Sequence, residues 1–166
     1  MGSNQTLFAW PSVDYMAFIK GIKSSETVKK SHQTIVDGIN SCLDGDRQTD
    51  FLELDVTGPA LHWAINELTE NAMGVGWAIM GRPLEVQLDT DITGVLHNKQ
   101  VSLNNSIMSN ISSESVGAKC ENLPNEVYRS DALRANTNFV TEKFERLKAF
   151  YSQAAAKDNA IISYSG

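Results

Sequence analysis

The stretch FLELDVTGPALHWAINELTENAMGVGWAIMGRPLEVQL, residues 51–88, decides the fold that the sequence predicts. It predicts a short strand, a long buried helix and a second short strand. Residues 51–56 alternate apolar and acidic side chains, as in a ribbon with one packed face. Gly58-Pro59 opens the helix because a proline in the first turn gives up an N–H that has no partner there. Gly81-Arg82-Pro83 ends it, since the residue before a proline disfavours helix, and residues 84–88 alternate again.

The central helix of this stretch is apolar on more than one side. Its apolar residues recur at helical spacing and continue through Trp77 to Met80. They include Leu61, Ile65, Leu68, Ala72 and Met73. Such a helix needs partners on several sides, so we expect the other helices to pack around it.

The flanking segments predict three more helices. Ser12 is suited to cap a first helix, and residues 28–43 carry the apolar stripe of a second after a short break at Ser24-Ser25. Two helices joined so tightly form an antiparallel hairpin. Ser130 caps a last long helix, whose apolar residues repeat by three and four.

We therefore predict a mainly all-α fold, an up-down four-helix bundle with a small β-ribbon. Residues 1–166 form a single domain in this prediction. The helical hairpin and the strand–helix–strand unit occupy residues 8–88, and a long polar inner loop follows at 89–127. Residues 128–156 form the last long helix, and 157–166 a frayed polar tail.

The polar segment 89–127 is the strongest hint of function in the sequence pattern. It is rich in Asn, Ser and Thr, and its few apolar residues are compatible with a short helix or hairpin. A polar loop of this length is uncommon in a compact domain unless it is functional or disordered.

Composition and charge exclude several classes of protein. The apolar fraction of 42% is that of a soluble globular chain, and no apolar run approaches the roughly 20 residues of a membrane span. No secretory leader opens the sequence, so we predict a cytosolic protein without membrane partners. The net charge of −6 argues against binding of nucleic acid by overall charge. Cys42 and Cys120 are predicted to be reduced thiols.

No motif for catalysis, metal binding or cofactor binding is present. His32, His62 and His97 lack metal-ligand spacing, and there is no Gly-x-Ser-x-Gly elbow. Trp10, Trp63 and Trp77 allow a ligand cage, but we interpret them as core or subunit-contact anchors. We therefore predict no enzymatic activity, no metal and no cofactor.

The order of elements resembles the coat proteins of rod-shaped plant RNA viruses, the tobamovirus, hordeivirus and tobravirus group. The resemblance covers roughly residues 8–150 as a pattern. It is carried by Trp10 with the helix 14–19, by the helix 28–43, by the strand 51–55, by Arg82 with 84–86, and by the entry 128–132 into the last helix. The closing aromatic motif of that family is only echoed, by residues 144–147.

The resemblance implies a coat protein that assembles with copies of itself into a helical rod around single-stranded RNA, located in the virion and the host cytoplasm. RNA would lie at the inner ends of the third and fourth helices. Arginine suits phosphate there, and asparagine suits base edges or riboses. The implied RNA-binding residues are Arg82, Arg129, Asp131, Arg134, Asn136 and Asn138. Solvation of a helix start explains Arg129 and Arg134 equally well.

The same resemblance implies carboxylates that face each other between subunits. Two carboxylates brought close raise the pKa of one of them, so rod assembly would strengthen as the pH falls toward about 5–6. The candidates are Glu53, Asp55, Glu85, Asp89 and Asp91.

Two other functions stay open from the sequence. One is a cytosolic, acidic helical binding protein, such as an immunity protein or adaptor, without RNA affinity. The other is an enzyme with a site on residues 89–126.

Overall fold

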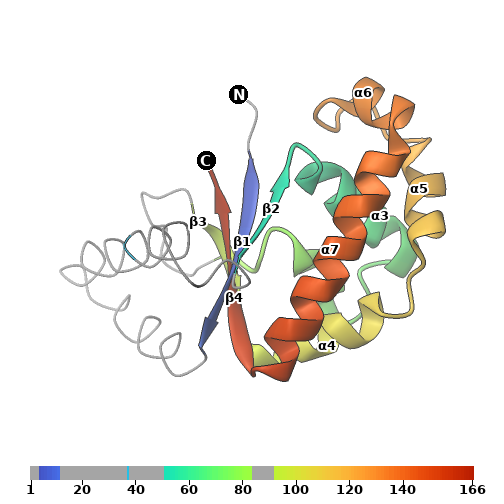
Figure 1. Ribbon diagram of the computed structural model, residues 1–166. Helices are drawn as coiled ribbons and strands as arrows, with labels where there is room; N and C mark the ends of the chain where they lie inside the picture. Colours follow the sequence, from blue (N-terminus) through green and yellow to red (C-terminus); the bar gives the residue numbers. More distant parts are fainter. Residues whose placement is uncertain (1–3, 12–36, 38–50, 84–91) are drawn as a thin grey trace.

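The computed structural model describes residues 4–11, 37, 51–83 and 92–166. Its strands are β1 (Gln5–Pro11), β2 (Phe51–Asp55), β3 (Ile92–Leu96) and β4 (Asn159–Ser165). The helices are α3 (Gly58–Thr69), the 3-10 helix η2 (Ala72–Ala78), α4 (Asn98–Met108), α5 (Ser113–Cys120), α6 (Ser130–Ala135) and α7 (Thr137–Ala156). Figure 1 shows these helices grouped on one side of the sheet, with α7 running along its length.

The sheet is antiparallel, with strand order β2-β1-β4-β3, so its central strands come from opposite ends of the sequence. The register runs from Gln5 opposite Ser165 to Pro11 opposite Asn159. β2 pairs with the outer side of β1, and β3 with the outer side of β4. The two ends of the chain therefore lie side by side (Figure 1).

Alternation along the strands divides the apolar side chains between the two faces of the sheet. The helical face receives Leu7, Leu54, Leu96 and Ile161, which join one large core cluster with the helices. The opposite face carries a smaller buried cluster of Phe8, Val95, Ala160 and Ile162. A central strand buried on both faces reads as a continuous apolar run, which explains the sequence Ala160-Ile161-Ile162.

The prediction of a mainly all-α, up-down four-helix bundle is wrong, because the described residues form an α/β fold with a four-stranded antiparallel sheet. The segment 157–166 is not a frayed tail, since it contains β4. Its polar ends concealed the strand, and its partner β1 lies at the far end of the sequence. Local periodicity gives no sign of such a pairing.

The prediction of a long polar loop at 89–127 is also wrong, since β3, α4 and α5 lie in it. Val101, Met108, Val116 and Cys120 are buried at helical spacing. The polar composition misled because α4 buries amides as well. Gln100 Nε2 donates to Asn104 Oδ1 at 2.8 Å, which offsets part of the cost of burying both.

Two helix predictions are partly correct. The strand at 51–55 and the helix start at Gly58-Pro59 are confirmed. The helix does not continue to Met80, because α3 ends in a turn where Glu70, Asn71, Met73 and Gly74 all have positive φ. Likewise, the last long helix is divided at Asn136 into α6 and α7.

Three predicted elements cannot be compared with the structure. The first helix, nearly all of the helix at 28–43, and the strand at 84–88 lie outside the described residues.

After η2 the chain crosses β3 at very short range. Gly81 has φ +66°, and a Cβ there would lie 2.4 Å from the backbone carbon of Gly94. Arg82 and Val95 exchange backbone hydrogen bonds of 3.0 and 2.9 Å just beyond this crossing. Only glycine fits here, since backbone atoms cannot move aside as a side chain can.

An ion pair joins α7 to the edge strand β2. Lys143 Nζ lies 2.6 Å from Asp55 Oδ2 and also donates to the Glu53 carbonyl at 3.0 Å. The Lys143 side chain is 9% exposed and the Asp55 side chain 42% exposed. The pair thus compensates a nearly buried ammonium group.

We expect Gly81→Ala to lower the free energy of unfolding by at least about 2 kcal/mol, since it combines left-handed strain with a backbone clash. Chemical denaturation measures this change. Gly117→Ala is the matched control: its Cβ would meet only Thr141 Cγ2, at 3.0 Å, and it lies within α5. An equal effect of the two substitutions would contradict the role of the crossing.

Asp55→Asn should cost about 1–2 kcal/mol of folding stability, less than for a fully buried pair because Asp55 is partly solvated. Lys143→Met removes both the buried charge and its pairing, so we expect it to cost less than Asp55→Asn. Urea unfolding of both variants checks this order. The reverse order would show that the Lys143 ammonium itself, rather than its compensation, stabilises the contact.

Candidate functional site

An open cleft of about 540 Å³ lies between α3 and the loop that leads to α6. Its wall is mostly apolar and aromatic, with a few polar groups. The lining residues are Pro59, His62, Trp63, Asn66, Met80, Glu126, Val127 and Tyr128. This size and composition are typical of sites for small molecules.

The helix α3 supplies one wall because its two sides differ in chemistry. Ala60, Leu61, Ala64 and Ile65 are buried in the core. The positions His62, Trp63 and Asn66 between them are only partly buried and turn toward the cleft. The apolar stripe that fixes the helix thus also aims the cleft-lining side chains.

The opposite wall, residues 123–131, is held by Arg134 of α6. Its guanidinium donates to the Leu123 carbonyl, to Asn125 Oδ1 at 3.0 Å, and to the Asp131 carboxylate. Three acceptors around one planar cation fix the shape of a segment that has little regular structure. Arg134 therefore orders the loop that contributes Glu126, Val127 and Tyr128 to the cleft.

The His62 ring is held neutral. Asn66 Nδ2 donates to the His62 carbonyl at 3.0 Å and lies 3.3 Å from Nε2, which assigns Nε2 as an acceptor. Burial lowers the pKa of His62, and the backbone of Gly76 only partly offsets this effect. Its Nδ1 is buried without a hydrogen-bond partner of normal geometry among the described residues. His62 therefore presents an uncharged surface to the cleft.

The packing of η2 against α3 requires a close approach at Gly76. A Cβ at this position would lie 2.1 Å from Asn66 Oδ1 and 2.4 Å from Asn71 Oδ1. The Gly76 N–H donates to Asn71 Oδ1 at 2.9 Å. Glycine thus lets η2 pack against α3 below the cleft.

The structure divides the residues expected to bind RNA. Arg129, Asp131 and Arg134 lie together around the second wall, where Arg134 and Asp131 form an ion pair. Arg82 lies elsewhere: its backbone pairs with β3, and its Nη2 is 3.4 Å from Gln100 Oε1 in α4. Asn136 is the exposed junction of α6 and α7, and Asn138 lines a shallow depression between α5 and α7.

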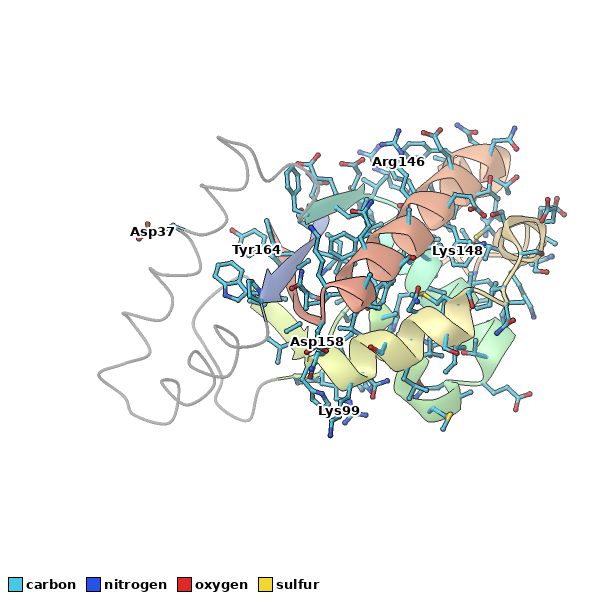
Figure 2. The ribbon with its side chains drawn as sticks, turned by 60° about the horizontal axis from the view of Figure 1, so that its bottom comes forward. Asp37, Lys99, Arg146, Lys148, Asp158 and Tyr164 are labelled. Carbon is cyan, nitrogen blue, oxygen red and sulfur yellow. The ribbon has the colours of Figure 1, made fainter. Side chains whose placement is uncertain are left out.

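Most cations on the helices are compensated by neighbouring acids. Arg146 pairs with Glu142 at 2.9 Å, and Lys148 with Glu145 at 3.2 Å. Figure 2 shows Arg146 and Lys148 along α7. These pairs leave no continuous basic strip along α7.

The expected intersubunit carboxylates are also separated. Asp55 pairs with Lys143 inside the chain, and Glu53 is exposed on β2. Glu85, Asp89 and Asp91 lie outside the described residues.

A second polar cluster lies beneath η2 and is structural. The buried Tyr151 hydroxyl donates to the Ala78 carbonyl at 2.7 Å, and Gln100 Nε2 donates to the Met73 carbonyl at 3.1 Å. Burial raises the pKa of Tyr151. These bonds hold η2 in place and leave no reactive group open to solvent.

The described residues offer no metal site and no reactive thiol. No group of three or more potential ligands is present among them, and none of their helices is long and apolar enough to cross a membrane. Cys120 is free and buried, and burial raises its pKa to about 11. A thiol with this pKa is a poor nucleophile at neutral pH.

Sequence reasoning missed the cleft. The interpretation of Trp63 as a core anchor is confirmed, since Trp63 packs against the main core, but this side chain lines the cleft as well. The sequence presents His62 only as a histidine without metal-ligand spacing. The available signal was the pair His62-Trp63 followed by Asn66 one turn later, on the side of α3 away from its apolar stripe. Arg134 was singled out, but as an RNA ligand rather than as the residue that holds the loop.

Comparison with known proteins identifies a family, and similar chains are found among the solved structures. The model of a family described as "Domain of unknown function (DUF1877)" matches residues 22–164. The crystal structure of YfbM from Escherichia coli, a protein of unknown function, is similar with a TM-score of 0.61 and 11% identity, over 98% of this chain and 99% of that chain. At this identity the likeness supports the fold alone. No curated protein matches the sequence.

These matches overturn the resemblance to plant virus coat proteins. The family match and the fold both point away from a helical capsid, and neither supports RNA packaging. The resemblance misled because it rested on the order of helices and on short motifs, without any long matched run.

We expect His62 to make stability depend on pH. Its pKa is lower in the folded state than the unfolded value of about 6.5, so its contribution is complete above that pH and is lost as the pH falls through the folded pKa. The loss is at most about 1.4 kcal/mol per pH unit. His62→Gln should remove this part of the pH dependence in urea titrations.

His97→Gln is the control for this measurement, because His97 is exposed at the start of α4. If both substitutions change the pH profile equally, the burial of His62 is not the cause.

Proposed function

The chain belongs to the family described as a domain of unknown function (DUF1877), and we propose that it is a small-molecule-binding protein whose site is the cleft between α3 and the loop before α6. The observation that carries the proposal is the lining of this cleft. Two aromatic residues, Trp63 and Tyr128, stand with Met80 and Val127 around an open volume of about 540 Å³. Apolar walls with a few convergent polar groups are the usual composition of a ligand site.

The second support is preorganisation. Arg134 fixes one wall by three hydrogen bonds, and on the other wall Asn66 Nδ2 donates to the His62 carbonyl at 3.0 Å. A cleft that is already ordered loses little conformational freedom when a ligand enters. The ordered walls therefore support the interpretation of this cleft as a binding site rather than as a surface depression without function.

The chemistry of the cleft favours binding over catalysis. His62, the group best suited to proton transfer, has its Nε2 beside Asn66 and its Nδ1 buried. Neither nitrogen is presented to a substrate, as a general base would have to be. Binding is therefore the function that the geometry supports best.

The proposal is tested with indole, benzyl alcohol and choline as probes in protein NMR titrations. At least one probe should shift the Trp63 indole N–H resonance saturably, and a bound probe should raise Tm. Trp63→Leu assigns that resonance and should abolish the binding. Trp77→Leu is the control, since Trp77 is also half-buried but does not line this cleft.

If none of the three probes shifts the Trp63 resonance, the protein does not use this cleft for such molecules. Binding that survives Trp63→Leu but not Trp77→Leu would place the site elsewhere.

A further inference from the structure

Glu126 is the charged side chain of the cleft. Of the eight residues that line it, the others are apolar, aromatic or uncharged, and His62 is held neutral. Glu126 is exposed, and it forms no ion pair with the described residues. Its carboxylate is thus available to pair with a cationic ligand in a cleft whose other lining residues carry no charge.

The side chains of Trp63 and Tyr128 both line the cleft, and Trp63 also packs against the main core. Neither Trp63 nor Tyr128 stacks on another aromatic ring among the described residues. Aromatic faces attract cations through the negative potential above the ring, most strongly in Trp. The cleft therefore combines two such faces with one carboxylate.

The Tyr128 ring already contacts a cationic side chain of the protein, that of Arg129. The guanidinium carbon of Arg129 lies 5.6 Å from the centre of the Tyr128 ring, and Arg129 Nε is 3.2 Å from the Tyr128 hydroxyl. Arg129 therefore lies toward the hydroxyl end of the ring. It lines the adjoining cavity of residues 125–132, not the cleft itself.

We propose that the ligand of this cleft is an organic cation, held by Trp63 and Tyr128 with Glu126 as its counter-ion. This inference rests on the proposed function and adds the charge of the ligand to it. An alkylated ammonium group suits the site, because it is weakly hydrated and can contact aromatic faces and the Met80 side chain at once. The guest supplies the positive charge that the lining residues lack.

Arg129 lowers the affinity in this arrangement. Its charge lies next to Tyr128 and repels a second cation, and the exposure of Arg129 to solvent keeps this repulsion modest. Removing it should therefore strengthen binding. This gives the proposal a substitution that increases affinity as well as one that decreases it.

The test compares choline with 3,3-dimethylbutan-1-ol, which has the same shape and no charge. NMR titration of the Trp63 indole resonance should show choline binding about tenfold more tightly than the alcohol. Glu126→Gln should weaken choline binding about threefold and leave the alcohol unchanged, whereas Arg129→Gln should strengthen choline binding. Glu121→Gln, an exposed acid that does not line the cleft, is the matched control.

The outcomes separate this inference from the proposed function. Equal binding of choline and the alcohol at Trp63 would overturn the cation and leave the binding cleft intact. Loss of the preference in Glu121→Gln as well as in Glu126→Gln would show that overall charge, not the cleft, selects the ligand, and would also overturn the inference. If neither compound binds, the inference fails together with its premise.

Discussion

The pairing of β1 with β4 is the constraint on which the rest of the structure depends. These strands contribute seven residues each, and the register extends to a backbone pair between Asn4 and Gly166. With both strands at the centre, β2 and β3 can only add at the edges, and α7 must return along the sheet to deliver β4. The helical layer, and the cleft built on it, follow from that return.

The shape of the cleft depends on hydrogen bonds from side chains to irregular segments of the backbone and to neighbouring side chains. Arg134 holds residues 123–131, and Asn71 holds the backbone of Gly76 in the helix η2, which packs against α3. Arg134 extends from the helix α6 to an irregular loop, and Asn71 extends from a turn to the 3-10 helix η2. The site is therefore the product of irregular connections tied to regular elements, as is common for binding sites.

Local patterns predicted the parts of the fold whose information is local. The strand at 51–55 and the helix start at Gly58-Pro59 were both visible in the sequence. The pattern failed where burial depends on distant partners: β4 was read as a tail, and α4 as a polar loop because Gln100 and Asn104 are buried as a pair. The cleft was missed because Tyr128 and Trp63 meet only in the folded chain.

The central position of the last strand also has a consequence for synthesis on the ribosome. β1 is synthesised before the other described strands, and its Leu7 and Phe8 are fully or almost fully buried in the folded protein. Its main partner, β4, is synthesised about 150 residues later, so the pairing of β1 with β4 cannot form before the segment between them has been translated. Until then the apolar side chains of β1 lack their main partner strand. Chaperones that bind exposed apolar segments could protect β1 from aggregation during this interval.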